Sequence, residues 1–402
     1  MTKPLEGIKV ADFTWALVGP ITTNTLAVWG ADVIKIEGRS RPDSRRISPP
    51  FKDNVPGLDR SATFYTYSLG KKSVALNLAR AEGIEVAKKI VAWADVVTDN
   101  FAGGAMKRMG LSYEVLREVK PDIIMMSSCP MGQTGPYPTA PSIGVHLTAL
   151  SGITNLAGWP DREATALDSY TDFVSPHFNA LAILAALDYR DRTGKGQYLD
   201  LSQYEDCMHF MAPLVLDYMV NKRVSTRTGN RLDSAAPHNV YSCLGDDRWC
   251  AIAVFTNAEW ASFCNVIGNP DWSRNPHFDN LASRKENEEE LDRFVTAWTM
   301  NYTAEDVMRM MQASGVAAGV VSNAEDVMEK DPQLQHRRFF REIDHPELGT
   351  YRAPRPPYIF SRFDCQLGRA PMLGEHNEYV LKNIAGLTDE EISKLILDGV
   401  LE

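Results

Sequence analysis

Short apolar runs alternate with segments of helical spacing over the first third of the chain. The apolar runs cover residues 7–13, 31–37, 71–78, 95–101 and 121–129, and the helical patterns between them cover residues 19–30, 82–94 and 113–119. Strands that alternate with helices favour a parallel sheet covered by helices on both faces. The pattern therefore predicts a doubly wound, Rossmann-like α/β domain.

The polar residues that follow these strands indicate where a ligand binds. In open α/β sheets, ligands bind outside the carboxyl ends of the strands. In this chain those positions are near Thr14, Glu37, Asn100 and Ser128. We expect the functional groups at this edge of the sheet.

The later part of the chain predicts a second, smaller domain. Residues 178–190 form an apolar helix that stops at the turn RTGKGQ, and the composition becomes polar near residues 225–240. A hairpin pattern across a GDD turn follows, and then two amphipathic helices over about 284–300 and 303–314.

These changes divide the chain into three parts. Residues 1–225 form the large Rossmann-like domain, residues 226–330 form a small α/β domain, and residues 331–402 return to the large domain. Within the last part, the proline-rich stretch 345–361 is predicted to be extended. A capped helix is predicted close to the chain's last residue.

Charge and composition exclude several classes of partner. The net charge is −10 and the pI is near 5.4, so the protein repels nucleic acids and anionic membrane surfaces. No apolar stretch is long enough to span a bilayer, and the first residues do not resemble a secretory signal, so a cytoplasmic location is expected. The six cysteines have no CxxC pairing and predict scattered thiols rather than a metal site.

The common nucleotide and hydrolase motifs do not occur. No GxGxxG follows the first strand, and a proline in that turn removes a backbone donor that a pyrophosphate would need. HExxH, GxSxG and the Walker pattern are also missing. The glycines in residues 103–110 fit the start of a helix better than a phosphate loop.

One aspartate stands out from its position. Asp172 comes just before a long apolar helix whose start is marked by Ser175 and Pro176, so its carboxylate is presented at a helix N-terminus. Two interpretations remain open from the residues alone. Asp172 caps the helix, or it is a functional carboxylate.

Several motifs, in their order along the chain, resemble class III CoA-transferases. This family includes the formyl-CoA:oxalate and carnitine CoA-transferases and the α-methylacyl-CoA racemases. The matching segments are PLEGIKVADFT, GP at 19–20, GADVIKIE, KKSVALNL, DNF with GG and RMG at 99–110, GQTGP at 132–136, RTGKGQ at 192–197 and LGEHN at 373–377.

The resemblance implies a fold, an assembly and a nucleophile. It implies a Rossmann-like large domain, a small domain, and two chains interlocked as rings, the partner being an identical chain or a paralogous subunit. Coenzyme A, carried as an acyl-CoA, is the implied substrate, with no metal. The family's catalytic aspartate corresponds to Asp172, which attacks the donor thioester as a carboxylate and then carries CoA as an aspartyl thioester.

The resemblance also implies the CoA contacts. They map to Asn100, Phe101 and Arg108, to the backbone around Leu17, Val18 and Leu76, and to an arginine after the second strand that stands here at Arg39. This last contact departs from the family, which often has the arginine one place earlier, where this chain has Gly38. A basic residue after the KKSVALNL strand is displaced to Arg80.

The acceptor pocket is expected to be apolar. The oxalate-specific enzyme has a glutamine where this chain has Leu17, which disfavours a small dianion. The prediction is therefore transfer of CoA from a donor such as succinyl-CoA to a larger, partly apolar acid. The N-terminal run VADFTWALVGPITT is most similar to benzylsuccinate CoA-transferase subunits of aromatic degradation.

Two alternatives are kept. An acyl-CoA racemase or isomerase needs a histidine where this chain has Ile143, and the nearby His146 is out of register. A non-catalytic CoA-binding subunit of a heteromeric transferase has no need of a nucleophile, yet Asp172 is present.

Overall fold

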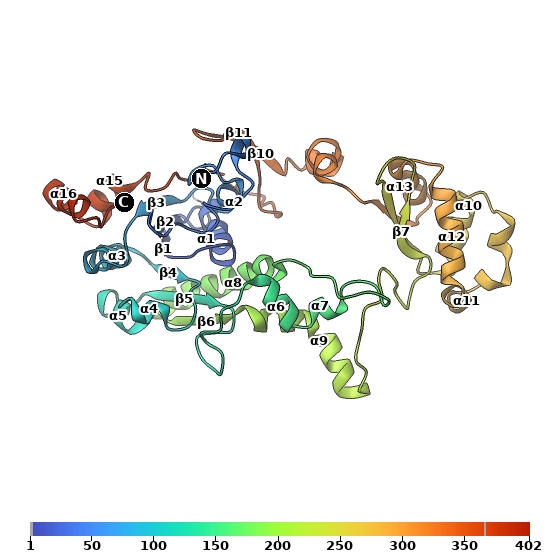
Figure 1. The fold of residues 1–402 in the computed structure, drawn as a ribbon, viewed down its shortest axis with the longest axis horizontal. Helices are drawn as coiled ribbons and strands as arrows, with labels where there is room; N and C mark the ends of the chain where they lie inside the picture. Colours follow the sequence, from blue (N-terminus) through green and yellow to red (C-terminus); the bar gives the residue numbers. More distant parts are fainter. Residues whose placement is uncertain (1–2, 366) are drawn as a thin grey trace. The chain divides into compact units, whose positions relative to one another are not determined.

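The computed structural model describes residues 3–365 and 367–402 and divides the chain into two compact units. The larger unit comprises Met1–Thr154, Ala166–Val224 and Gln335–Glu402. The smaller unit comprises Asn155–Thr165 and Ser225–Leu334. The smaller unit is thus an insertion into the sequence of the larger one (Figure 1).

The larger unit is built on a six-stranded parallel sheet, which confirms the predicted α/β class. Its order, β3-β2-β1-β4-β5-β6, is the strand order of doubly wound dinucleotide-binding folds. The strands are β1 (Lys9–Asp12), β2 (Asp32–Glu37), β3 (Lys72–Ala75), β4 (Val96–Asp99), β5 (Ile124–Cys129) and β6 (Tyr198–Ser202). The chain reverses direction across the sheet between β1 and β4, where this fold class places its ligands.

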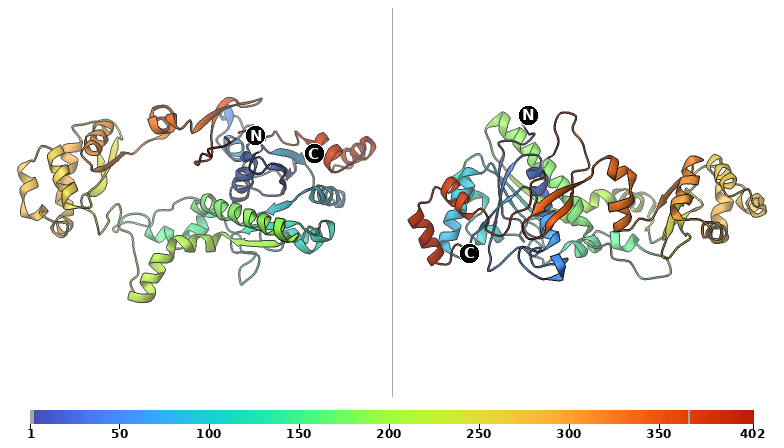
Figure 2. Two further views of the ribbon diagram at one scale, coloured as in Figure 1. Left: turned by 180° about the vertical axis from the view of Figure 1, so that it is seen from behind. Right: turned by 90° about the horizontal axis from the view of Figure 1, so that it is seen from above.

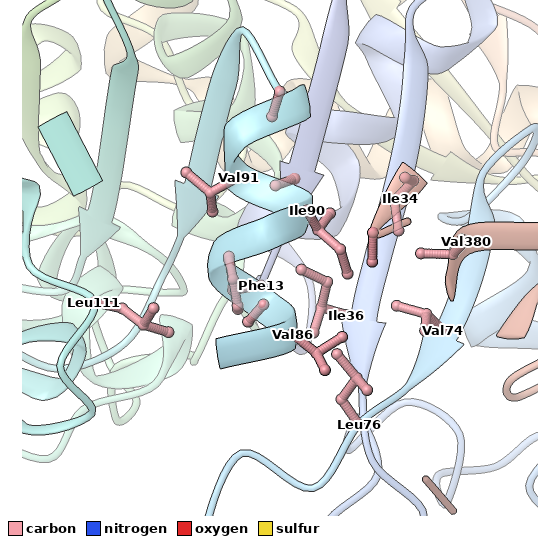
Figure 3. Close-up of a cluster of buried hydrophobic side chains, with 14 of the residues drawn as sticks. Phe13, Ile34, Ile36, Val74, Leu76, Val86, Ile90, Val91, Leu111 and Val380 are labelled. Carbon is pink, nitrogen blue, oxygen red and sulfur yellow. The ribbon is translucent and has the colours of Figure 1, made fainter. Parts of the chain in front are cut away.

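Helices cover both faces of the sheet. Alternate residues of a strand point to opposite faces, so Val10 packs with α1 (Val18–Val28) and α8 (Tyr170–Thr193), whereas Ala11 faces the opposite core. On that second face, α3 (Ala81–Trp93) lays its buried side chains on the strands (Figure 3). The central strands are thereby buried on both faces, as is typical of a parallel sheet, while the edge strand β6 keeps exposed positions.

The last part of the chain completes the second face. The short turn Val380–Ile384 and the helix α16 (Asp389–Leu397) contribute to the same core as α3 and α5 (Tyr113–Val119). The predicted cap of α16 is confirmed, because Thr388 and the third residue of the helix form a reciprocal capping box.

The prediction for residues 345–361 missed a hairpin. Strands β10 (Phe340–His345) and β11 (Gly349–Pro354) pair antiparallel, with Gly349 at a φ of 73° where the second strand begins. The four prolines at 346, 354, 356 and 357 suggested an extended chain, without indicating the pairing. Pro346 lies in the turn, Pro354 is the last residue of β11, opposite Phe340, and the other two prolines follow it, so the inner part of the ladder keeps its N–H donors.

Two long helices lie side by side in the larger unit (Figure 2). Helix α8 begins at Tyr170, earlier than the predicted start at Ser175 and Pro176, and α9 covers Gln203–Asn221. Both helices expose large apolar side chains. These are Tyr170, Phe173, Leu181, Leu184 and Tyr189 on α8, and Phe210, Val215, Leu216, Tyr218, Met219 and Val220 on α9.

The smaller unit has its own sheet and its own core. The predicted hairpin is confirmed as β7 (His238–Ser242) and β8 (Trp249–Ala253), and β9 (Ala317–Val320) adds an antiparallel third strand. The unit's α-helices are α10 (Asn257–Val266), α11 (Leu281–Glu286), α12 (Glu288–Thr299) and α13 (Ala304–Ala313). Their apolar faces cover the strands.

Candidate active site

A cavity of about 530 Å³ opens at the carboxyl ends of β2 and β3 in the larger unit. This volume lies within the usual range of ligand pockets. Three of the predicted CoA-binding residues line it, namely Leu76, Phe101 and Arg108. The cavity therefore lies at the edge of the sheet that the strand pattern indicated.

The turn after β1 forms one wall of this cavity. The Asn100 side chain forms two hydrogen bonds with the backbone of Trp15. It accepts one from the Trp15 N–H and donates one to the Trp15 carbonyl, each at 2.7 Å. Trp15 then presents its ring to the cavity, where it meets the ring of Phe101 edge to face at 5.6 Å. Asn100 thus shapes the cavity although it does not line it.

The remaining predicted residues lie outside the cavity wall. Leu17 and Val18 are buried where α1 begins, shortly after Trp15 in the sequence. Arg39 is exposed and is not among the lining residues. Arg41, two residues later, lines the cavity instead and places its guanidinium 5.0 Å from the Trp15 ring centroid.

A short helix completes the cavity. Gly103 and Gly104 precede α4 (Ala105–Arg108), and Gly104 has a φ of 74°, which a side chain would strain. A Cβ on Gly103 would lie 2.6 Å from the carbonyl oxygen of Pro138. The glycines therefore start a helix, as predicted, and hold Arg108 at the rim of the cavity.

Asp172 lies in the first turn of α8, because that helix begins at Tyr170. Pro176 is inside the helix, and since proline lacks an N–H, the carbonyl of Asp172 loses its usual helical partner. Burial raises the pKa of Asp172 to about 6, against an opposing attraction from Arg45 and with a further increase from Asp168. No hydrogen bond from a described residue contributes to this pKa.

The sequence did not indicate Gly144, which touches the Asp172 carboxylate. Gly144 begins α6 (Gly144–Leu150), and a Cβ at this position would lie 2.8 Å from Asp172 Oδ2 and 2.7 Å from the Cβ of Ser169. Only glycine lets the backbone pass so close to the carboxylate. In the sequence, the position of this glycine directly before an apolar helical segment was the one signal that could have indicated its role.

A buried ion pair fixes the loop that carries the cavity's Arg41. Lys35 and Asp43 are both fully buried and form an ion pair at 2.9 Å. Asp43 Oδ1 also accepts hydrogen bonds from the backbone N–H of Ala16 at 3.0 Å and of Arg45 at 2.9 Å. Ala16 has a φ of 62°, so this bond holds the turn after β1 in an uncommon conformation.

Among the described residues, no helix is long and apolar enough to cross a membrane. In the same part of the chain, no group of three or more His, Cys, Asp or Glu side chains is placed to bind a metal ion.

Comparison with known proteins relates the chain to enzymes that transfer CoA. A family model described as CoA-transferase family III matches residues 5–377. The succinyl-CoA–D-citramalate CoA-transferase of Chloroflexus aurantiacus is 31% identical over 398 residues, covering 98% of this chain and 97% of that one. The Homo sapiens succinyl-CoA:glutarate CoA-transferase is 28% identical over 410 residues, covering 100% and 90%.

Another relative is named as a subunit, and a solved structure has the same fold. The beta subunit of succinyl-CoA–L-malate CoA-transferase from Chloroflexus aurantiacus is 31% identical over 400 residues, covering 98% of this chain and 97% of that one. The crystal structure of a CAIB/BAIF family protein from Brucella suis has a TM-score of 0.87 and 29% identity, and it covers 96% of this chain and 100% of that one.

Proposed function

Since the chain belongs to CoA-transferase family III, and is therefore a CoA-transferase, we propose that it moves CoA from succinyl-CoA to a larger, partly apolar carboxylic acid. Benzylsuccinate is the first acceptor to test. The observation that carries the proposal is the Asp172 carboxylate, which is half-buried in the first turn of α8. It lies against Gly144, where any side chain would collide with it.

Asp172 is the covalent nucleophile of the proposed reaction. Its carboxylate oxygen attacks the thioester carbonyl carbon of succinyl-CoA, the C–S bond breaks, and CoA thiolate leaves a mixed anhydride. The thiolate then attacks the Asp172 carbonyl of the anhydride and releases succinate, so that Asp172 carries CoA as a thioester. The acceptor carboxylate then attacks the carbonyl carbon of the Asp172 thioester and displaces the CoA thiolate, which gives a second anhydride. The thiolate attacks the acceptor's acyl carbon, so the acceptor leaves as its acyl-CoA and the Asp172 carboxylate is restored.

The surroundings of Asp172 suit this role. With its pKa near 6, about 90% of the carboxyl is ionised at pH 7, so no general base is needed. A nucleophile whose lone pairs accept no hydrogen bond from described residues is free to attack. Partial burial also limits water, which would hydrolyse the anhydride.

The cavity at the ends of β2 and β3 is proposed as the CoA site. Arg41 and Arg108 line it and are proposed to bind the phosphate oxygens, which a guanidinium can hold with two parallel hydrogen bonds. The rings of Trp15 and Phe101 give a base an aromatic surface to stack on. The expected contact of Arg39 with CoA stays a prediction, which calorimetric titration of an Arg39→Met variant with CoA would test.

A second chain is proposed to cover α8 and α9. Their exposed apolar side chains, among them Phe173 on the turn of Asp172, form a surface that a monomer would leave in water. The partner is an identical chain, interlocked as the family resemblance implies, or a paralogous subunit. The relative that is named as a beta subunit supports testing both.

Trapping the intermediate tests the function. The protein is incubated with succinyl-CoA, quenched with hydroxylamine, and the modified carboxylate is located by mass spectrometry. We expect modification at Asp172 that is lost in Asp172→Asn and kept in Asp188→Asn, an exposed aspartate on the same helix.

Two results would count against the proposal. The first is no adduct with several donors and with a candidate partner subunit present. The second is rapid deuterium exchange at the acyl α-carbon without any acceptor acid, which would identify an isomerase.

A further inference from the structure

Two neighbouring arginines of the loop before α2 (Ala62–Thr66) have opposite environments. Arg46 is fully buried, and its guanidinium donates hydrogen bonds to Glu37, to Asp59 and to two backbone carbonyls. Arg45 Nε is also buried, but no described residue accepts a hydrogen bond from it. A buried donor without a partner is costly and is rare in native proteins.

The side chain of Arg45 is near enough to the proposed nucleophile for its charge to act on it. Its positive charge acts on Asp172 and on the hydroxyl of Tyr67. The Tyr67 ring meets the ring of Phe173, the residue after Asp172, at 6.2 Å. Arg45 and Tyr67 therefore belong to the surroundings of the Asp172 turn, with the Tyr67 ring packed on Phe173 and the buried Arg45 Nε free of a described partner.

The backbone of Arg45 is held firmly although its side-chain Nε is not. Its N–H is bound by Asp43, which is fixed by the buried pair with Lys35. The next residue, Arg46, is fixed by the buried carboxylate of Glu37. Two buried ion pairs thus place Arg45 and leave Nε available for a ligand.

Covalent catalysis changes the charge that Arg45 faces. In the resting protein, the Asp172 carboxylate provides the opposite charge. When Asp172 carries CoA as a thioester, that charge is gone, and a partly buried guanidinium loses its counter-ion. An acceptor acid enters at this stage, and its carboxylate restores the missing charge.

We propose that Arg45 binds the reacting carboxylate of the acceptor acid while Asp172 is joined to CoA, an inference that rests on the proposed covalent function. One carboxylate oxygen pairs with the guanidinium while the other attacks the carbonyl carbon of the Asp172 thioester. The C–S bond breaks, CoA thiolate leaves, and the acyl group is joined to Asp172 as an anhydride. Attack of the thiolate on the acyl carbon then frees the Asp172 carboxylate, whose negative charge again faces Arg45.

The test separates formation of the adduct from its discharge. The Asp172 adduct is formed with succinyl-CoA, excess donor is removed, and loss of the adduct is followed by mass spectrometry against acceptor concentration. Succinate serves as the probe acid, because the reverse reaction needs no knowledge of the natural acceptor. The variants are Arg45→Gln, Arg45→Met and Arg45→Lys, with Arg192→Gln as an exposed arginine control on α8.

We expect the neutral variants to form the adduct but to need roughly 10- to 100-fold more succinate for half-maximal discharge, the size of one charged hydrogen bond. Arg45→Lys should recover part of this loss, and Arg192→Gln should match the wild type. A purely structural role would lower the adduct yield without changing the succinate dependence.

Failure of this inference is distinguishable from failure of the function. If a neutral variant that folds discharges with the wild-type succinate dependence, Arg45 does not bind the acid, although the covalent mechanism stands. If the wild type itself forms no adduct, the proposed function fails first. Two neutral variants are used so that misfolding of one leaves the test intact.

Discussion

Replacing Asp172 with asparagine should stabilise the protein while abolishing its proposed chemistry. Burial raises the pKa of this carboxyl from 3.8 to about 6, so the folded state disfavours the ionised form. Above pH 6 the folded protein bears this cost in full, and below pH 3.8 the carboxyl is protonated whether folded or unfolded. The gain from asparagine is therefore present at neutral and high pH and is lost as the pH falls through this interval.

The size of the effect follows from the pKa difference. Two pKa units correspond to about 3 kcal/mol, which is an upper bound. The side chain keeps some contact with water, and the neutral asparagine leaves Arg45 without its opposite charge, so the net gain is reduced. We expect the free energy of unfolding to rise by roughly 1–2 kcal/mol at pH 7.5.

Urea unfolding of wild type, Asp172→Asn and Asp188→Asn at pH 7.5 and pH 4 measures this difference. Asp188 is exposed and, among the described residues, is paired with Arg192 alone, one turn away, so its variant should stay within about 0.5 kcal/mol of the wild type at both pH values. A variant Asp172→Asn that is less stable than the wild type at pH 7.5, or equally changed at both pH values, would refute the reasoning.

Three further predictions concern the same unit. Labelling of Asp172 by succinyl-CoA, followed by mass spectrometry from pH 5 to 8, should be half-maximal near pH 6 and rise with pH, because the ionised carboxyl reacts; a flat profile would exclude titration of this group. Arg46→Met should lower the free energy of unfolding, measured in urea, by roughly 3–5 kcal/mol, because it removes the arginine that pairs with the buried Glu37 carboxylate. The matched variant Arg117→Met, at an exposed arginine, should change the free energy of unfolding little. Arg41→Met and Arg108→Met should each weaken CoA binding about tenfold in calorimetric titrations, and unchanged affinity would place the phosphates elsewhere.

The sequence predicted the sheet well because its signals are local. Each strand of the parallel sheet is a short apolar run, and a buried parallel strand needs little else to be recognised. Phe101 closely follows the end of β4 and lines the cavity, whereas Arg108 ends the next helix and was indicated only by the family resemblance. That either residue binds CoA stays a prediction. The start of α8 was misplaced because Ser175 and Pro176 resemble a helix start, whereas the helix begins at Tyr170.

Contacts made by an irregular loop were beyond such reasoning. The segment between β2 and α2 has no periodicity, so nothing distinguished Arg39 from Arg41 or Arg45. The backbone at Arg45 is held by Asp43, which forms a buried ion pair with Lys35, eight residues earlier in the sequence. An ion pair of this kind leaves no pattern that a single sequence reveals.

The core on the second face of the sheet also governs how the chain folds as it is made. Val74 and Val86 share that core with Leu395 and Val400, and most of the chain, including the whole smaller unit, is translated between them. At a translation rate of roughly 5–20 residues per second, some 15–60 s pass between synthesis of Val86 and synthesis of the last apolar side chains of this core. The smaller unit can close its own core during that interval. A chaperone that shields the open face of the sheet would therefore act on a ribosome-bound chain whose smaller unit is already folded.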